Sequence, residues 1–402
     1  MRIAMLTNNY KPYVGGVPIS IEHLAEELRK RGHTVYIFAP SYRKQEDELY
    51  VIRYPSFPLS VAGAPLPNIL TGLFRQKMKE LQIDLIHVHH PAIAGNVALT
   101  LRRQLGIPVV FTYHTRYEEY LYYVKSLQQV ERCTGVINSY LRYFCNHCDL
   151  LLAPTPGIEE HLLYEKGVET PVEILPTGIL KENFFPEKNA VIEIKKKYRQ
   201  KADYMFCTVA RLAKEKNLDF LFEALKKTKE ALAFQGKTFR HLMIGEGLEK
   251  EHLEKKCLEL GLEKEVIFLG NVDNRQIKNY QAACDLFLFT SKSETQGIVL
   301  LEAMAAGTPV VAVDATGVRD VVRTKENGML STEDADCFAA AIEQALCSPG
   351  LYTRLRDHAK KTAAEYAETE IARRAEQLYL QLLSKYQYKC YNVRVGNEQC
   401  QN

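Results

Sequence analysis

The feature that most constrains the fold of this 402-residue chain is an alternation of short apolar runs with longer amphipathic stretches. In the first part of the chain, the apolar runs are Arg2–Thr7, Thr34–Ala39, Asp84–His89, Pro108–Tyr113, Leu150–Pro154 and Val172–Leu175. Between the first two runs, Ile19–Arg31 has apolar residues at helical spacing, and Gly32 ends this stretch. Strands that alternate with helices in this way form βαβ units, so the sequence predicts an α/β fold with parallel sheets covered by helices on both faces.

The alternation is interrupted by the charged segment Phe185–Arg199 and then restarts. The runs of the second series are Met205–Ala210, His241–Ile244, Val266–Leu269, Asp285–Thr290 and Pro309–Val313. Because the chain is also too long for one typical domain, the sequence predicts two doubly wound, Rossmann-like domains, at residues 1–185 and 186–365. Such sheets bind ligands at the carboxyl ends of their strands, so we expect the domains to face each other across a cleft that holds the site. For the polar tail, residues 386–402, no regular structure is predicted.

Composition and charge limit the partners of the chain. The net charge of +3 gives no argument for nucleic acid, and no nucleic-acid partner is expected. Residues 1–150 hold 17 Lys/Arg against 12 Asp/Glu, a surplus that suits either an anionic membrane surface or a solvated face. No apolar stretch approaches the ~20 residues that span a bilayer and no N-terminal signal is recognised, so we expect a cytoplasmic protein, at most peripheral on the inner face of the membrane. Cys145, His147 and Cys148 lack a second pair at metal-ligand spacing, so no metal site is predicted.

The segment Ser293–Pro309 (SETQGIVLLEAMAAGTP) holds the strongest indication of a ligand site. The apolar run before it predicts a strand, and its own apolar middle predicts a helix that Ser293 or Thr295 caps. Backbone N–H groups at such a helix start attract phosphate. Glu294 lies before the helix and Glu302 just over one turn inside it, so the segment can hold a phosphorylated sugar at both ends. The pattern therefore indicates a nucleotide-sugar site.

Other candidate residues follow the predicted strands of the second domain. Arg211 and Lys216 come after the first of these strands, at a spacing that lets both reach one diphosphate, although solvated loop cations are the alternative. The sequences GEG (Gly245–Gly247) and GNVD (Gly270–Asp273) come after the next two strands. Each of these either admits a base or ribose against backbone or forms a tight turn.

The first domain offers three candidates of the same kind. Gly15 and Gly16 lie between its first strand and first helix, where backbone without Cβ atoms can approach a ligand, although a plain βα loop also uses glycines. His114 stands in a polar context at the carboxyl end of a central strand. The tyrosine-rich sequence RYEEYLYYV, which begins at Arg116, is either a helix half buried in the core or an acceptor platform.

Together and in this order, these motifs resemble the retaining glycosyltransferases of family 4, which have the GT-B fold. The resemblance covers about residues 1–385, and its most specific part is the E-x7-E element from Glu294 to Glu302. It implies that Arg211 and Lys216 bind the diphosphate of a nucleotide sugar. By the same resemblance, Glu294 would bind the hydroxyls of the transferred sugar and Glu302 those of the ribose.

The resemblance assigns the remaining site residues as well. It places further donor contacts at Gly15, Gly16, Gly245, Val272, Gly297, Ile298 and Val299. His114 would lie near the sugar and join the catalytic residues, while Arg116, Tyr117 and Tyr120 would bind the acceptor. No metal and no cofactor are implied, and a helix at about residues 366–385 would cross back to pack on the first domain.

Within the family, YHTRYEEYLYYV and SETQG resemble the diacylglycerol glucosyltransferases of bacterial glycolipid synthesis. They imply transfer of a hexose, glucose, from a UDP-sugar to diacylglycerol or a related lipid, with Leu66–Met78 as a surface helix carrying Arg75 and Lys77. The alternative is a soluble acceptor: a small hydroxy acid, a sugar phosphate or a phenolic compound. A UDP-sugar epimerase and a non-catalytic nucleotide-sugar binding module are less favoured. A phosphorylase lacks a context for a pyridoxal lysine, and a dehydrogenase lacks the GxGxxG fingerprint.

Overall fold

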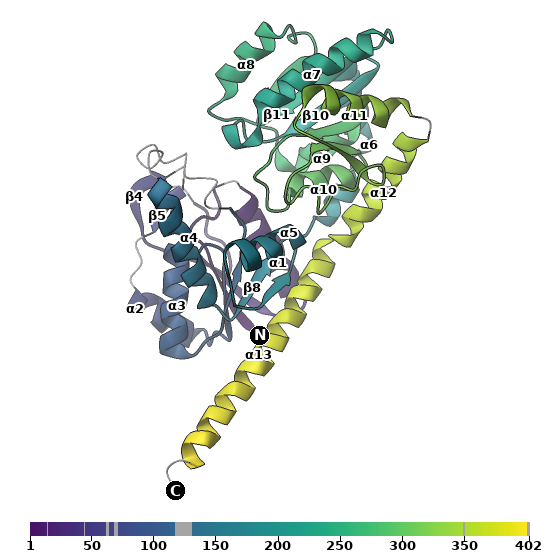
Figure 1. The fold of residues 1–402 in the computed structure, drawn as a ribbon. Helices are drawn as coiled ribbons and strands as arrows, with labels where there is room; N and C mark the ends of the chain where they lie inside the picture. Colours follow the sequence, from purple (N-terminus) through teal and green to yellow (C-terminus); the bar gives the residue numbers. More distant parts are fainter. Residues whose placement is uncertain are drawn as a thin grey trace. The chain divides into compact units, whose positions relative to one another are not determined.

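The computed structural model describes residues 1–13, 15–43, 45–61, 64–67, 71–116, 131–348 and 350–399 (Figure 1). The chain divides into two compact units: Met1–Gly178 with Glu368–Asn402, and Ile179–Ala367. The predicted boundary near Phe185 lies inside the second unit. The charged segment Phe185–Arg199, which suggested this boundary, belongs to the second unit. There the N–H of Glu187 donates to Asn279 Oδ1 at 2.8 Å.

Among the described residues of the first unit, seven parallel strands form one sheet in the order β3-β2-β1-β6-β7-β8-β9. Their bounds are β1 (Arg2–Leu6), β2 (Thr34–Pro40), β3 (Val51–Tyr54), β6 (Leu85–Val88), β7 (Val109–Thr112), β8 (Leu150–Ala153) and β9 (Val172–Ile174). A separate antiparallel pair consists of β4 (Ser56–Val61) and β5 (Ala64–Pro67). Because all strands of the main sheet are parallel, their carboxyl ends lie along one edge, as the sequence predicts.

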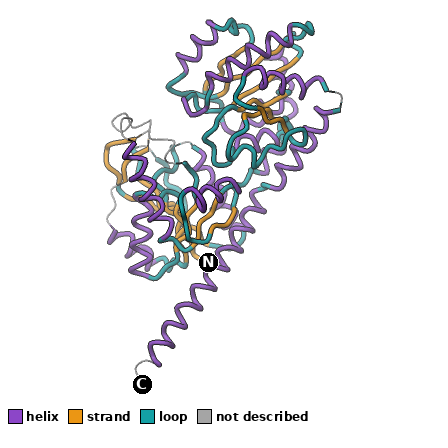
Figure 2. Tube along the Cα trace, viewed as in Figure 1, coloured by secondary structure: helices purple, strands orange, loops and turns teal. Residues whose placement is uncertain are grey.

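Helices cover both faces of this sheet (Figure 2). They are α1 (Gly16–Lys30), α2 (Thr71–Glu80), α3 (Ile93–Leu105), α4 (Glu131–Asn146), α5 (Pro156–Glu160), the π-helical turn η2 (His161–Glu165) and α13 (Glu368–Gln399). Side chains of β1 alternate between the faces: Ile3 and Met5 join the core with α1 and α13, whereas Ala4 and Leu6 join the core with α2, α3 and α4. Both faces of β1 are therefore buried, as expected for a strand in a parallel sheet that helices cover on both sides.

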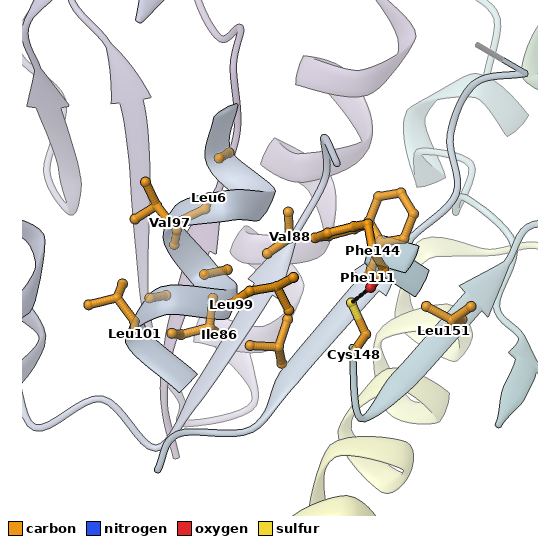
Figure 3. Packing of buried hydrophobic residues seen from close by; sticks show 14 of the residues in the cluster. Leu6, Ile86, Val88, Val97, Leu99, Leu101, Phe111, Phe144, Cys148 and Leu151 are labelled. Atoms are coloured by element: carbon orange, nitrogen blue, oxygen red, sulfur yellow. Dashed lines mark hydrogen bonds between the residues drawn. The ribbon is translucent and has the colours of Figure 1, made fainter. Parts of the chain in front are cut away.

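Figure 3 shows the packing of the second of these cores. Phe144 of α4 meets Phe111 of β7 with ring centroids 5.0 Å apart. A Cβ on Gly95 of α3 would lie 2.6 Å from the Phe144 ring, so only glycine lets these helices approach so closely. Cys148 belongs to the same core, where its Sγ donates to the Phe144 carbonyl at 3.4 Å, and burial raises its pKa well above the ordinary value. Cys145 and Cys148 therefore act as apolar core residues.

The second unit repeats the plan with six parallel strands among its described residues, in the order β12-β11-β10-β13-β14-β15. The strands are β10 (Tyr204–Val209), β11 (Phe239–Ile244), β12 (Val266–Gly270), β13 (Leu286–Phe289), β14 (Val310–Val313) and β15 (Gly328–Ser331). The helices are η3 (Lys181–Phe184), α6 (Lys188–Ile194), η4 (Lys195–Arg199), η5 (Lys214–Lys216), α7 (Leu218–Ala233), α8 (Lys250–Glu259), α9 (Asn274–Ala283), α10 (Ile298–Ala305), α11 (Ala335–Cys347) and α12 (Leu351–Glu365). Again two cores lie on opposite faces, with Phe206 in one and Met205 and Cys207 in the other.

The C-terminal region differs from the prediction for residues 386–402. Helix α13 continues through this segment to Gln399. The segment contains no proline and its single glycine, Gly396, is tolerated in a helix, so nothing in the sequence stops it. Where α13 begins, a Cβ on Gly178 would lie 2.6 Å from the Cα of Glu368, so a glycine is needed where these two backbone segments pass each other.

Candidate functional site

Strands β10 and β13 are neighbours in the sheet of the second unit, and their carboxyl ends bring two loops together. The hydroxyl of Thr290, directly after β13, donates to the carbonyl of Lys216 at 2.9 Å. The hydroxyl of Ser291 donates to the carbonyl of Glu215 at 3.2 Å. These two bonds fix the loop after β10 against the end of β13, so the predicted cations and carboxylates belong to one rigid surface.

Lys216 and Glu294 form an ion pair on this surface. Their side chains are 17% and 22% exposed, so both remain within reach of a ligand. Arg211 lies on the same loop, 46% exposed, with its Nη2 2.6 Å from Glu215 Oε1. The structure thus brings together the three charged residues that the sequence predicts for the diphosphate and the sugar.

The start of helix α10 lies next to this pair in sequence, and its cap differs from the prediction. The N-cap is Gly297, in the left-handed conformation with φ +67°, and no side chain caps the helix. The predicted cap by Ser293 or Thr295 is therefore wrong: the chain reverses at Gly297, which only glycine does without strain. The Oγ of Ser293 is instead buried, with no hydrogen-bond partner among the described residues. With no side-chain cap in place, the first N–H groups of α10, from Ile298 and Val299, keep the anion-attracting character of an open helix start.

Glu302 lies one turn further into α10, between the buried core residues Leu301 and Ala303, and is itself half-buried. Burial raises the pKa of its carboxyl to about 7, against a smaller lowering effect of a hydrogen bond from Asn183. A carboxylate with this pKa changes its charge near neutral pH, which is unusual for glutamate. Asn183 belongs to η3, and apart from its polarity no sequence pattern indicates its role.

Glycines around the site serve different purposes. A Cβ on Gly317, after β14, would lie 2.4 Å from the carbonyl oxygen of Glu294, so this glycine lets two site loops touch. A Cβ on Gly245 or Gly247 would lie 1.9 Å or 2.1 Å from the carbonyl oxygens of Ala210 and Leu212. Close backbone packing therefore explains the GEG sequence without a ligand. Val272 packs partly buried against the α9–α10 side of the core.

His114 of the first unit lies at the carboxyl end of β7 and belongs to a histidine cluster. Its Nε2 is 2.9 Å from Nδ1 of His89, and the two rings stack with centroids 5.2 Å apart. His87 contacts His89 at 4.1 Å between centroids, and its Nε2 is 2.7 Å from the Thr112 hydroxyl. Burial lowers the pKa of His114 and of His87 to about 3, and that of His89 well below its ordinary value. The cluster is therefore neutral at physiological pH. The HVHH sequence at residues 87–90 was the available signal for it.

Of the remaining predicted residues of the first unit, some are described by the structure and some are not. Gly15 precedes α1 in extended backbone, and Gly16 begins the helix. No heavy atom lies within 4 Å of a Cβ built on Gly16, so the described fold leaves space beside this backbone. Arg116 is half-buried. Tyr117 and Tyr120 lie outside the described residues.

In the described part of the chain, no cluster of three or more His, Cys, Asp or Glu side chains could hold a metal ion. An Asp-x-Asp spacing at Asp334 and Asp336 belongs to the start of α11, where Asp334 Oδ1 accepts from the N–H of Cys337 at 2.9 Å. None of the described helices is both long enough and apolar enough to cross a bilayer.

Comparison with known proteins identifies the family to which the chain is similar. The sequence model of the family "Glycosyltransferase Family 4" matches residues 14–182, and that of "Glycosyl transferases group 1" matches residues 191–362. The alpha-monoglucosyldiacylglycerol synthase of Acholeplasma laidlawii is 29% identical over 400 residues, which cover 96% of this chain and 98% of that protein.

Two solved structures share the fold over nearly the whole chain. Sucrose-phosphate synthase from Thermosynechococcus elongatus superposes with a TM-score of 0.77 at 23% identity, covering 96% of this chain and 99% of the other. HepE of Anabaena, in complex with UDP-glucose, superposes with a TM-score of 0.71 at 21% identity, covering 96% of this chain and 100% of the other. The predicted fold class, two Rossmann-like domains of the GT-B type, is confirmed.

Proposed function

We propose that this chain, which belongs to the family 4 glycosyltransferases and has the GT-B fold, transfers glucose from UDP-glucose to diacylglycerol with retention of configuration. The observation that carries the donor half of the proposal is the Lys216–Glu294 ion pair beside the uncapped start of α10. A cation and a helix start suit a diphosphate, and a carboxylate suits the hydroxyls of a sugar.

When the donor binds, the two partners of the ion pair would separate, one to contact the diphosphate and the other the glucose. The Lys216 ammonium would turn from the Glu294 carboxylate to the diphosphate, with Arg211 beside it. The freed carboxylate of Glu294 would then accept hydrogen bonds from the glucose hydroxyls. In the ligand-free protein the two groups hold each other in position, so little reorganisation is required when the donor binds.

The chemical step would place most of the charge on the leaving group. As the bond between the anomeric carbon and the phosphate oxygen breaks, negative charge grows on UDP, where Lys216, Arg211 and the α10 dipole stabilise it. The acceptor oxygen forms its bond to the same face of the anomeric carbon, and the acceptor proton passes to the leaving phosphate oxygen. Such a route needs no metal ion and no separate protein base.

A lipid acceptor is supported by the name of the Acholeplasma relative, which covers almost the whole chain. Helix α2 of the first unit adds a physical argument, because it carries Leu73, 56% exposed, on the same short helix as Lys77. Apolar and basic groups on one exposed helix favour contact with an anionic bilayer surface. We therefore place the protein on the cytoplasmic face of the membrane as a peripheral enzyme.

The proposal is tested in two steps. Release of free hexose is first measured across a panel of nucleotide sugars, with UDP-glucose expected to be turned over fastest. The best donor is then given with diacylglycerol in anionic vesicles, and separately with small hydroxy acids, sugar phosphates and phenolic compounds. Transfer to one of the soluble acceptors but not to diacylglycerol would overturn the lipid assignment. Epimerised product without any acceptor would overturn the transferase assignment.

A further inference from the structure

A cavity of about 310 Å³ lies in the first unit between helix α2 and the strands β2 and β3. Its apolar lining includes Phe38, Tyr54, Leu73 and Phe74. Phe74 of α2 packs on Phe38 and Tyr54, with ring centroids 5.6 Å and 5.3 Å apart, and all three are at least 95% buried. Leu73, by contrast, is 56% exposed, so the cavity has an aromatic floor and an aliphatic residue at the surface.

Most of the polar side chains that line this cavity already have protein partners. The Tyr54 hydroxyl donates to the Thr7 carbonyl at 2.6 Å, and Arg53 Nη1 donates to the Pro40 carbonyl at 3.2 Å. Gln76 and Lys77 both donate to the Glu80 carboxylate, at 2.9 Å and 3.2 Å. Arg53 Nη2 donates to Glu48 at 3.4 Å, whereas its Nε is buried from solvent and has no partner among the described residues.

This pairing decides which kind of ligand the cavity suits. A sugar or a nucleotide would lose its hydrogen bonds to water on entry and would meet an aromatic floor and mostly paired polar side chains in return. A hydrocarbon chain loses no hydrogen bonds and gains contact with the aromatic floor. The volume of the cavity lies at the lower end of the range for small-molecule sites, which suits a single chain rather than a whole lipid.

We propose that this cavity binds one acyl chain of the lipid acceptor. The inference rests on the proposed lipid acceptor and adds to it the place where the apolar part of that acceptor is held. Two positive charges beside the cavity support this proposal. Arg75 and Lys79 are exposed on the same helix as Leu73. A chain that leaves an anionic bilayer can therefore enter beside residues that attract that bilayer.

Photolabelling with a diacylglycerol that carries a diazirine in one acyl chain tests the site directly. The full-length protein is irradiated with this probe in vesicles of phosphatidylcholine and phosphatidylglycerol, and the labelled peptides are mapped by mass spectrometry. Labels are expected within residues 52–55 and 73–80, and excess unlabelled diacylglycerol should remove them. Labels that map elsewhere, or that unlabelled lipid does not remove, would overturn the assignment.

Leu73→Asp is the matching variant, because the exposed side chain can be changed without disturbing the floor. It is expected to lower labelling of these peptides at least tenfold and to raise the KM for diacylglycerol, with the KM for the donor unchanged. Leu258→Asp on α8, where the leucine is 66% exposed, is the control and should change neither. If Leu73→Asp proves unstable, Leu73→Trp narrows the entrance instead and should shift the enzyme toward shorter acyl chains. Unchanged labelling in a folded Leu73 variant would overturn the proposal.

The two proposals fail in different ways. If the cavity is labelled and competed by diacylglycerol but no glucose reaches the lipid, the acceptor assignment fails and the cavity stands as a lipid site. If glucose is transferred to diacylglycerol but labelling avoids the cavity, the enzyme assignment stands and the cavity assignment fails.

Discussion

At the scale of single residues, the ion pair of Lys216 and Glu294 connects the fold to the chemistry. Both side chains are partly exposed, so the pair contributes little to stability, about 1 kcal/mol or less. Its position at the carboxyl ends of two neighbouring strands, beside an uncapped helix, is difficult to explain as a stabilising device. A functional role explains it better, and the substitution of either partner separates the two readings.

Glu294→Gln is expected to lower kcat/KM for the donor about 10²-fold or more, because the neutral amide accepts sugar hydroxyls less strongly and no longer pairs with Lys216. The melting temperature should stay within a few degrees of the original value. Glu265→Gln is the matched control, because Glu265 forms an ion pair with Lys229 at 3.0 Å in the same unit. Equal losses of activity in both variants would show that the effect is not specific to the site.

Glu302 should make donor binding depend on pH. Its pKa is raised to about 7, so the carboxylate that would accept the ribose hydroxyls forms only as pH rises through neutrality. We expect kcat/KM for the donor to increase between pH 6 and pH 8, and Glu302→Gln to remove this increase. His114 contributes no step in this range, because its pKa is about 3. A step that persists in Glu302→Gln would assign the titration to another group.

The same carboxyl should act on stability with the opposite sign. Its folded-state pKa is raised from 4.5 to about 7, because burial penalises the ionised carboxylate in the folded protein. The free energy of unfolding therefore falls as pH rises through that interval. Glu302→Gln should therefore raise the free energy of unfolding by about 3 kcal/mol at pH 8 but by only about 1 kcal/mol at pH 5. Chemical denaturation at the two pH values measures this difference. A gain of equal size at pH 5 would contradict it.

At the scale of elements, Gly16 at the start of α1 and Gly317 after β14 give contrasting predictions. Gly16→Ala adds a Cβ with no heavy atom within 4 Å at the first position of α1, so folding should be unchanged. If Gly16 provides backbone approach to the donor, activity should nevertheless fall about tenfold or more. Gly317→Ala places its Cβ 2.4 Å from the carbonyl of Glu294 at a φ of +78°, so both stability, by about 1–3 kcal/mol, and activity should fall. Thermal unfolding and donor turnover of the two variants are compared; an active Gly16→Ala enzyme would remove Gly16 from the site.

Elements with strong local patterns could be predicted from the sequence. The predicted helix at Ile19–Arg31 corresponds to α1, which begins three residues earlier and ends one residue earlier. The predicted strand Val266–Leu269 differs from β12 only by its last residue. Two edge strands were missed, because Val51–Tyr54 contains Arg53 and Gly328–Ser331 contains few apolar residues. Their strand conformation depends on pairing with β2 and β14, which are distant in the sequence. Local propensity cannot supply such pairing.

The residues of the site, like the elements, could be predicted only where a strong local pattern marks them. Residues that follow strongly patterned strands, such as Arg211, Lys216 and Glu294, could be placed together because parallel strands end on one edge. Residues that reach the site from elsewhere could not. Asn183 comes from η3, far from Glu302 in the sequence, and Gly317 from the loop after β14. Their roles follow from tertiary packing alone.

At the scale of the whole molecule, α13 completes the first unit with residues from the far end of the chain (Figure 1). Ile371, Ala375 and Tyr379 fill the core that also contains Ile21 of α1. The Tyr379 hydroxyl lies 2.8 Å from Nδ1 of His87, and both side chains are fully buried. The histidine cluster that contains His114 is therefore held partly by the last helix.

Truncations at two points of α13 test this arrangement. A chain that ends after Tyr386 keeps every core residue among the described side chains of the helix and should unfold within ~2 °C of the full chain, since a shift of that size corresponds to less than about 1 kcal/mol. A chain that ends after Arg374 loses Ala375 and Tyr379, and the loss of one buried aromatic side chain alone costs about 3–5 kcal/mol. Tyr379→Phe should lie between the two, because it leaves the buried Nδ1 of His87 without its partner at a cost of about 1–3 kcal/mol.

Hydrogen exchange shows where the stability is lost. In the chain that ends after Arg374, amides of β1 and β6 should exchange much faster, since these strands lie against the core that α13 closes. Amides of β10 and β13 belong to the other unit and should keep their protection. Faster exchange in β10 and β13 as well would mean that the two units unfold together. Unchanged exchange in β1 and β6 would mean that the first unit is complete without α13 and that Tyr379 only covers it.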